Sequence, residues 1–345
     1  MIALLAPAAQ AGANPIRIAL FHTELERKAP GLLFRDIGKG SADILAAARR
    51  VAKVQAEVVV PLGIDFDAHN LALLRFSERI SQFGGPYYPH VFSTRPNTGM
   101  PSGMDLDGDG RTGTPRDAQG YGRFSGQGGM GILSRFPFAD AEIEDHSATL
   151  WTDLEWADLP RDANGLFPSE EVYKLQRLST TGHWVIPVLI DAETTLRLGV
   201  FHATPPAFDG PEDRNGKRNA DEIRFWSHYL DHSPPQNDPV IIGDANLDAE
   251  RGKGILSAIR GLLSHPDLSD PFPKNPPTVY WTEIGLGQMR TDYILPSLHW
   301  QTINQGILWP EDATENESRH AVVWVDLIPN PAPMPAKLEL SAANE

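Results

Sequence analysis

In Ile241-Ile242-Gly243-Asp244-Ala245-Asn246, an apolar run ends in a carboxylate and an amide two residues apart. The apolar part predicts a buried β-strand, in which side chains two positions apart point to the same side. Asp244 and Asn246 would then act on one reactant, the carboxylate by orienting or deprotonating a nucleophile and the amide by holding an oxyanion. A strand-end Asx turn would place the same residue types there without a function.

Three other apolar segments carry polar residues of catalytic type at one end. Leu198-Gly199-Val200-Phe201-His202 ends in an imidazole, and Arg290-Thr291-Asp292-Tyr293-Ile294 carries an acid near its start. Ser318-Arg319-His320 leads directly into the apolar run 321–325. Capping explains one such coincidence more easily than four, so the pattern predicts a site where several strand ends meet.

Strands and helices are expected along the whole chain. The strand candidates are residues 16–21, 57–61, 131–134, 183–190, 195–202, 239–243, 292–295 and 321–327, and the helix candidates are 43–54, 71–82, 169–178, 218–232 and 254–263. This mixture, without a clear linker, predicts a single layered α/β domain. Residues 92–127 have little periodicity, and a loop of that length is usually functional or disordered.

The domain is expected to cover residues 15–328. Residues 1–14 are interpreted as a flexible N-terminus or a signal-peptide remnant, and 329–345 as a Pro- and Ala-rich tail. Ala9-Gln10-Ala11 matches the A-x-A pattern that signal peptidase cuts. The protein is therefore predicted to be secreted or periplasmic, with a cytoplasmic location as the alternative. The chain contains no Cys, which excludes disulfides and thiolate ligands.

The composition favours a globular protein and limits its partners. Hydrophobic residues make up 41% of the 345 residues, enough to form a substantial core. The formal net charge is -15, from 45 acidic and 30 basic residues. Because sequence-independent binding to nucleic acid depends on basic side chains, nucleic acid is an unlikely partner and nuclease activity is disfavoured. No apolar stretch has the length needed to span a bilayer.

The order of these motifs resembles the endonuclease/exonuclease/phosphatase superfamily. A strand ending in His is followed by Gly-Asp-x-Asn, Arg-x-Asp-Tyr and Ser-x-His before a last strand, and Gly131-Ile132-Leu133-Ser134-Arg135-Phe136-Pro137 resembles another strand of the family. The resemblance implies a four-layer α/β sandwich, with two mixed β-sheets packed face to face and helices on the outer faces. It also implies hydrolysis of phosphodiesters or phosphomonoesters, usually with Mg²⁺ or another divalent ion.

The resemblance also implies roles for five residues. His320 would be the general base or acid, and Asp292 would orient it. Asp244 would align the attacking water, while Asn246 and His202 would contact phosphate oxygens. The substrate would be a phosphorylated small molecule or a lipid- or inositol-type phosphate ester.

The metal-binding half departs from the family pattern. His22 stands where the first strand normally ends in a metal-binding Asn, and Gly63 stands where the second strand normally supplies a Glu ligand. Arg319 replaces the Asp of the usual Ser-Asp-His. Mg²⁺ selects oxygen ligands, so these replacements should weaken an ordinary Mg²⁺ site.

Two explanations compete for this departure. In the first, Asp65 or Asp67 supplies the missing carboxylate and His22 shifts the preference toward Mn²⁺ or Zn²⁺, which accept imidazole as a ligand. In the second, Arg319 contacts the substrate phosphate and takes over part of the charge of the ion. The alternative to an enzyme is a catalytically reduced protein that binds phosphorylated ligands.

A second ion site is predicted in the long loop. Asp105, Asp107 and Asp109 alternate as in the opening of a Ca²⁺ loop, and Asp117 is expected to complete a structural Ca²⁺ site. Arg116 occupies the twelfth position, which excludes a true EF-hand. A solvated turn is the alternative reading.

Two further residues are candidates for binding substrate. His183 opens a strand and is predicted to line the cleft, unless it is a structural histidine. Arg214 lies in the polar segment 211–219 after the His202 strand, from which its cation could reach a substrate phosphate.

Overall fold

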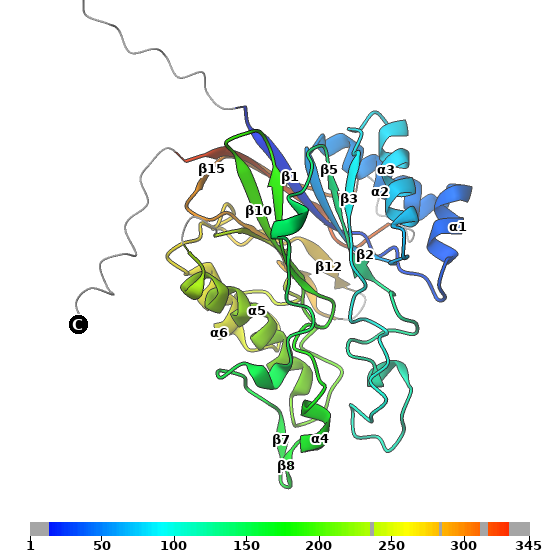
Figure 1. The fold of residues 1–345 in the computed structure, drawn as a ribbon, viewed down its shortest axis with the longest axis vertical. Coiled ribbons are helices and arrows are strands. Elements are labelled where there is room, and N and C mark those ends of the chain that lie inside the picture. Colours follow the sequence, from blue (N-terminus) through cyan, green and yellow to red (C-terminus); the bar gives the residue numbers. More distant parts are fainter. Residues whose placement is uncertain (1–13, 235–237, 283–284, 311–316, 331–345) are drawn as a thin grey trace, which may run out of the picture.

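Two β-sheets lie face to face between two layers of helices (Figure 1). The computed structural model describes residues 14–234, 238–282, 285–310 and 317–330. The predictions for the first 13 residues and for 331–345 lie outside the described residues. The four-layer sandwich expected from the sequence is confirmed.

The first sheet contains both ends of the described chain. Its strand order is β15-β16-β1-β2-β5-β3, and β4 pairs with β2. The strands are β1 (Ile16–His22), β2 (Val58–Ile64), β3 (His90–Phe92), β4 (Gly129–Met130), β5 (Ile132–Ser134), β15 (Trp300–Leu308) and β16 (Val322–Pro329). The parallel pair β1 and β2 requires a crossover, which α1 (Leu32–Lys39) and α2 (Ala42–Val54) supply. These helices and α3 (Leu71–Gln82) cover the outer face of the sheet.

The second sheet has the order β14-β11-β10-β9-β6. Its strands are β6 (Glu144–Asp145), β9 (His183–Leu189), β10 (Thr195–His202), β11 (Val240–Asp244) and β14 (Asp292–Leu295). The parallel pair β10 and β11 is joined through α5 (Arg214–His232), which packs with α6 (Leu256–Leu263) on the outer face. Two small hairpins lie outside the sheets, β7 (Arg161–Asp162) with β8 (Gly165–Leu166) and β12 (Val279–Trp281) with β13 (Gly287–Met289).

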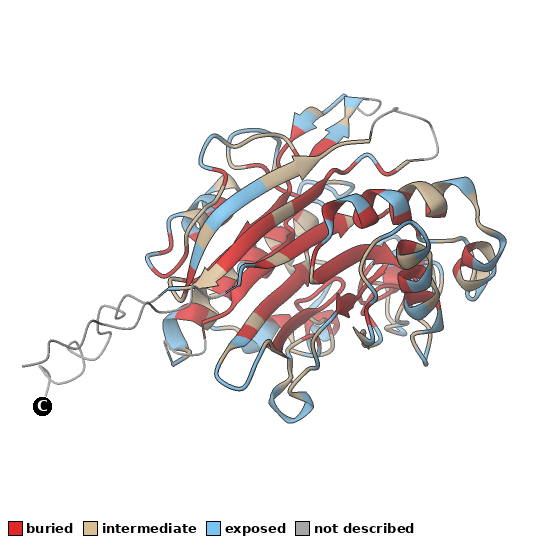
Figure 2. Ribbon diagram, turned by 90° about the horizontal axis from the view of Figure 1, so that it is seen from above, coloured by how far each residue is buried: buried red, intermediate tan, exposed pale blue. Residues whose placement is uncertain are grey.

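The core explains why the strands read as continuous apolar runs. In β1, Ile18 and Leu20 face the second sheet, while Ala19 and Phe21 face the helices. Both faces of the central strands are therefore buried, as the coloring in Figure 2 shows. The strand ends are fixed by this packing, so side chains that project from them are held in place.

Some elements differ from the sequence prediction. The helix expected over 169–178 is a single turn, α4 (Glu170–Tyr173), and the helix expected from 218 begins at Arg214. The chain also contains α1, a short helix stabilised by burial of Leu33 and Ile37 rather than by a long periodic pattern. No helix in the described ranges is long and apolar enough to cross a membrane.

Gly243 allows β11 to approach β10 closely. A Cβ at this position would lie 2.1 Å from the carbonyl oxygen of Phe201. We therefore expect Gly243→Ala to lower the free energy of unfolding by about 2 kcal/mol or more, because backbone must move. Gly261→Ala is the matched control: Gly261 is exposed in α6 with open space around it, and alanine there should raise stability by about 0.5–1 kcal/mol. Urea denaturation of both variants measures the difference, and equal stabilities would contradict this account.

Candidate active site

Ends of strands from both sheets meet at one place. His22 ends β1 of the first sheet, while His202 and Asp244 end the neighbouring parallel strands β10 and β11 and are register partners. Asp292 begins β14 opposite Asp244. His320 forms a bridge with Val279 just before β16, which pairs with β1. The topology thus brings together side chains that are up to 298 residues apart, from His22 to His320.

His320 and Asp292 form a buried hydrogen-bonded pair. Nδ1 of His320 lies 2.9 Å from Oδ2 of Asp292, and the hydroxyl of Thr278 donates to the same oxygen at 2.8 Å. Both side chains are 1% exposed. The carboxylate of Asp292 accepts a hydrogen bond from Nδ1–H, which leaves Nε2 as the basic nitrogen of the ring. His320 lines the cleft, so this pair has the arrangement of a general base and its orienting carboxylate.

His22 and Asp244 form a second pair, which crosses between the sheets. Nδ1 of His22 lies 2.8 Å from Oδ2 of Asp244. Burial opposes charge on His22, but the hydrogen bond and the negative charge of Asp244, helped by Glu24 and Asp292, raise its pKa to about 9. Burial also disfavours the charge on Asp244, yet the hydrogen bond from His22 and the charge of His320 hold its pKa well below the usual range. Without another ligand, this pair is an imidazolium and a carboxylate at neutral pH.

His202 lies edge-on to His22 but is a neutral group. The ring centroids of the two imidazoles are 4.7 Å apart, and Nε2 of His202 is 3.9 Å from Oδ2 of Asp244. Burial first, and then the charge of His22, lower the pKa of His202 to about 3. The neutral ring lines the cleft and can offer a hydrogen bond to a phosphate oxygen without adding charge.

Asn246 follows Asp244 in a turn and not in an extended strand. Its backbone φ is 49°, its N–H donates to Oδ1 of Asp244 at 2.7 Å, and its side-chain amide donates to the carbonyl of Ala203 at 2.9 Å. The Asx-turn reading of this motif is therefore correct locally. Asn246 nevertheless lines the cleft, and one of its two amide N–H groups is left for a ligand.

His22 packs against Gly63 near the end of β2. Gly63 is the penultimate residue of the strand, with a φ of 65°, and a Cβ there would lie 2.8 Å from Cδ2 and 2.9 Å from Nε2 of His22. A carboxylate at position 63 and the observed position of His22 thus exclude each other. The imidazole of His22 therefore occupies the place that a side chain at position 63 would take.

Glu24 is a site residue that the sequence reading missed. The backbone N–H and the guanidinium of Arg319 both donate to its carboxylate, at 2.8 Å to Oε2 and 2.9 Å to Oε1. Although burial opposes its charge, Arg319, His320 and His22 lower the pKa of Glu24 to about 2. Arg319 lines the cleft and forms an ion pair with Glu24, and its contact with a substrate phosphate stays a prediction.

The predicted carboxylate ligands Asp65 and Asp67 have other roles. Asp65 accepts backbone N–H groups of Arg27 and Gly128, and burial raises its pKa to about 6. Asp67 accepts the backbone N–H groups of His69 and of Leu71 and Ala72, the last two in the first turn of α3, whose orphan donors it satisfies. Neither belongs to the group of active-site side chains that could jointly hold an ion, so the structure does not support either as an active-site ligand.

The residues that could hold an ion here are His22, Asp244, Asp292 and His320. Each offers one ligand atom, and these atoms lie within 4.8 Å of one another. Oδ1 of Asp292 is buried and has no hydrogen-bond partner among the described residues. A buried carboxylate oxygen without a partner fits an ion ligand, and a set containing two imidazoles fits Zn²⁺ or Mn²⁺ better than Mg²⁺.

The two additional substrate-binding candidates have different outcomes. His183 is fully buried, with Nδ1 2.6 Å from the Ser179 hydroxyl and Nε2 2.9 Å from the Glu222 carbonyl. Burial lowers its pKa to about 3, so it is a structural histidine and the prediction that it lines the cleft is not supported. Arg214 does line the cleft, and its guanidinium donates to the carbonyl of Leu106.

The loop carboxylates are only partly arranged as expected. Asp105, Asp107 and Asp109 place ligand atoms within 4.8 Å of one another. Asp117 instead accepts hydrogen bonds from Thr114 and from the backbone of Leu106, in the cap of a short 3₁₀ turn. Asp117 therefore does not complete this group, and a structural Ca²⁺ ion stays a prediction for the three remaining carboxylates.

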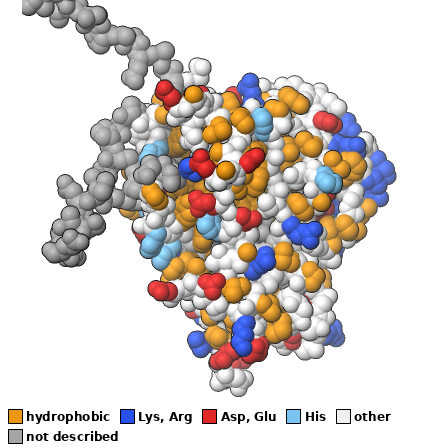
Figure 3. Space-filling model, in the orientation of Figure 1, with side chains coloured by type: hydrophobic (Ala, Val, Ile, Leu, Met, Phe, Trp, Pro, Cys, Tyr) orange, Lys and Arg blue, Asp and Glu red, His pale blue; other side chains and the backbone are white. Residues whose placement is uncertain are grey.

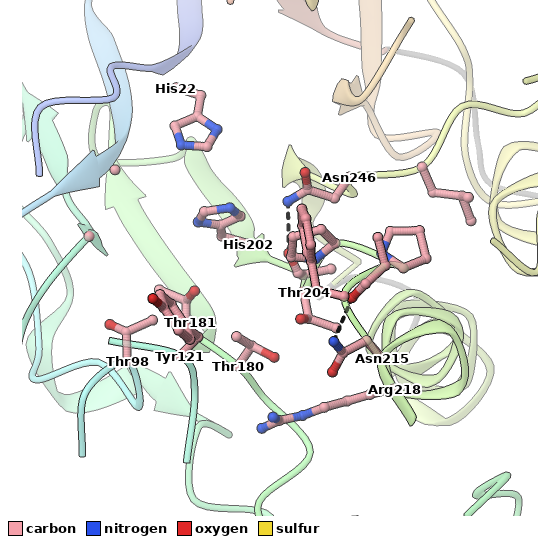
Figure 4. Close-up of a pocket in the computed structure, with 18 of the residues that line it drawn as sticks. His22, Thr98, Tyr121, Thr180, Thr181, His202, Thr204, Asn215, Arg218 and Asn246 are labelled. Atoms are coloured by element: carbon pink, nitrogen blue, oxygen red, sulfur yellow. Dashed lines mark hydrogen bonds between the residues drawn. The ribbon is translucent and has the colours of Figure 1, made fainter. Parts of the chain in front are cut away.

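The site opens into a cleft of about 880 Å³. Figure 4 shows His22 and His202 on one side of it, with Asn246 and Thr204 on another. The long loop predicted to be functional or disordered is ordered and supplies Thr98 and Tyr121 to the opposite wall.

Comparison with known proteins identifies the family. A model of the endonuclease/exonuclease/phosphatase family matches residues 39–324. The chain belongs to this family. Members of the family are mostly hydrolases of phosphate esters and generally use divalent metals. No curated protein matches the sequence.

Solved structures of the family share the fold at low sequence identity. An endonuclease/exonuclease/phosphatase protein from Beutenbergia cavernae DSM 12333 is 17% identical with a TM-score of 0.54, covering 94% of this chain and 74% of its own. The human Nocturnin catalytic domain with bound sulfate is 13% identical with a TM-score of 0.51, covering 93% and 96%. D. rerio TDP2 complexed with single strand DNA product is 13% identical with a TM-score of 0.50, covering 91% and 99%.

The prediction that nucleic acid is an unlikely partner is not supported. One structural neighbour, TDP2, is complexed with single strand DNA. Net charge describes the whole surface and does not determine the potential of one groove. On the face shown in Figure 3, basic side chains lie among acidic ones, so the charge of that face neither marks nor excludes a site for a polyanion.

Proposed function

We propose that this protein hydrolyses phosphate esters in the cleft, with His320 as the group that transfers protons. The observation that carries the proposal is the buried pair of His320 and Asp292, in which His320 lines the cleft and Asp292 lies opposite the buried Asp244. A purely structural role would not require an imidazole that is fixed by a carboxylate and also lines the cleft.

The chain supplies the parts of an in-line displacement by water. Asp292 accepts the hydrogen bond from Nδ1–H of His320, so that Nε2 faces the reaction. Nε2 then takes a proton from the attacking water or returns one to the leaving oxygen. Asp244 is ionised and orients the water. Asn246 and the neutral His202 offer hydrogen bonds to the phosphoryl oxygens, where negative charge develops in the transition state.

A divalent ion would be held by His22, Asp244 and Asp292, which leaves His320 for proton transfer. When bound, such an ion polarises the phosphoryl group and offsets its negative charge. Imidazole among the ligands supports Zn²⁺ or Mn²⁺ in preference to Mg²⁺. Since His22 has a raised pKa in the protein alone, an ion would displace its proton on binding.

Removing the ion should abolish turnover. After dialysis against EDTA, we expect hydrolysis of bis(p-nitrophenyl) phosphate to fall by about 10²-fold or more, because the transition state loses its Lewis acid. Adding Zn²⁺ or Mn²⁺ should restore the rate at lower concentrations than Mg²⁺. Full activity after EDTA treatment would contradict the ion requirement.

Binding of phosphorylated ligands without turnover is the second candidate. It is favoured by the packing of His22 against Gly63, which removes the oxygen ligand that the family normally places there. No hydrolysis with any divalent ion, together with micromolar or tighter binding of phosphate compounds, would establish this function in place of the first.

A further inference from the structure

The cleft is larger than a phosphate group requires. Its volume of about 880 Å³ falls within the range of pockets that enclose drug-sized organic ligands. His22, His202 and His320 line only one part, and the segments 98–128 and 203–208 contribute other walls. Space next to the phosphate site is therefore available for the organic part of an ester.

Two aromatic side chains line the cleft without being buried. Tyr121 is 62% exposed and Phe208 is 73% exposed. Large apolar side chains of a soluble protein are usually covered by other residues. When a ligand covers an exposed aromatic ring, the free energy falls, so such a ring favours binding. The two rings come from separate segments, one before β4 and one before α5.

The backbone fixes Tyr121 in its wall. It is flanked by two glycines that are packed too tightly to carry a side chain. A Cβ at Gly120 would lie 2.0 Å from the carbonyl oxygen of Thr180, and one at Gly122 would lie 2.6 Å from the nitrogen of Gly99. Tyr121 is thus the side chain that this segment presents to the cleft, as Figure 4 shows.

Phe208 is held in an unusual backbone conformation. Its φ is 68°, in the left-handed region that bulky residues rarely adopt. Two hydrogen bonds hold the backbone at Phe208. The side-chain amide of Asn215 donates to the carbonyl of Ala207 at 2.6 Å, and the guanidinium of Arg116 donates to the carbonyl of Phe208 at 2.5 Å. Retention of an exposed ring on a strained backbone is typical of a binding residue.

Arg116 also ties the two walls together. It belongs to the segment that carries Tyr121, and it joins that segment to the Phe208 loop. Asp107 holds the same guanidinium, with Nε 3.1 Å from Oδ2. The contacts of Arg116 thus link the loops that carry the two aromatic residues, and a link present before a ligand binds lowers the entropic cost of binding.

We infer that Tyr121 and Phe208 form the subsite for the organic part of the substrate, and that this part carries a planar ring. The inference rests on the proposed phosphate-ester site, which would hold the phosphorus end of the same molecule. Fixed aromatic side chains bind most favourably to a flat π-surface, by stacking or edge contacts. A flexible acyl chain would bind less favourably there, because it would have to adopt one conformation to contact both rings.

Binding of non-hydrolysable phosphonates tests this inference. Benzylphosphonate has a methylene in place of the ester oxygen, and cyclohexylmethylphosphonate has a puckered ring of similar size. By calorimetry, with inorganic phosphate as the reference, we expect the benzyl compound to bind about tenfold more tightly than the cyclohexyl compound. In Tyr121→Ala and Phe208→Ala the preference should fall to about twofold or less, while the affinity for inorganic phosphate stays the same.

Two variants serve as controls. Tyr87 is 68% exposed and is not among the residues that line the cleft, so Tyr87→Ala should keep the preference for the planar ring. Phe208→Gly should lose the preference and yet unfold at a higher urea concentration, because glycine adopts the left-handed conformation without strain.

The outcomes separate this inference from the proposed function. Equal affinity of wild-type protein for the two ring compounds would overturn the planar-ring subsite, provided that inorganic phosphate binds. Tightest binding of heptylphosphonate would also overturn it, in favour of an acyl chain. Failure of phosphate and all three phosphonates to bind would overturn the proposed phosphate-ester site itself.

Discussion

His320→Ala is expected to lower the turnover number by about 10³-fold, the usual contribution of a positioned general acid or base. The imidazole is 1% exposed, is oriented by Asp292 and lines the cleft. A side chain in this position acts mainly on proton transfer and not on ground-state binding. The affinity for inorganic phosphate should therefore change by less than about threefold. Initial rates with bis(p-nitrophenyl) phosphate and calorimetric titration with phosphate measure the two effects.

His69→Ala provides the matched control. His69 is exposed in the loop before α3, is not among the cleft residues, and should retain full turnover when replaced. A His320→Ala protein that keeps more than about a tenth of the wild-type rate would rule out His320 as the proton-transfer group. Lost phosphate affinity with a normal rate constant would instead assign His320 to substrate binding.

Asp244→Asn is the second substitution with a large expected effect, about 10²- to 10³-fold on turnover. Asparagine keeps the size of the side chain but removes the buried negative charge that orients water and binds an ion. The same charge stabilises the protonated form of His22, whose pKa is about 9. We therefore expect the pKa of His22 to fall toward its ordinary value in the variant, which NMR titration of the metal-free protein would show.

Asp326→Asn is the control for this substitution. Asp326 is also largely buried and bound to a cation, with its two oxygens 2.7 and 2.8 Å from the guanidinium of Arg17, but unlike Asp244 it is not in the group of side chains that could hold an ion. Its replacement should leave turnover and the titration of His22 unchanged. If Asp244→Asn behaves like this control, the carboxylate has no part in the reaction.

The sequence was sufficient for the fold and for the ends of the catalytic strands. An apolar run that stops at a carboxylate or an imidazole is a local signal, and the β10 and β11 runs end at His202 and Asp244 as their patterns indicate. The order of four such signals was specific enough to indicate the family, which is confirmed. The site residues were assigned through that order, and the structure brings them together.

The remaining parts of the site depend on contacts that have no local signal. Glu24 stands in a short polar segment, and its significance comes from Arg319, which is 295 residues away in the chain. Asp65 and Asp67 look like ligands in the sequence because carboxylates near a strand end are typical of ion sites. Their carboxylates are used by backbone N–H groups, which a linear reading does not reveal.

The hydrogen bond between His22 and Asp244 joins residues from the two opposed sheets, and 2.8 Å leaves little tolerance. A relative slip of the sheets by about 1 Å would break it. The turnover rate should therefore depend strongly on the relative position of the two sheets. We expect conservative substitutions in the apolar layer between the sheets to change the turnover rate even where they scarcely change the free energy of unfolding.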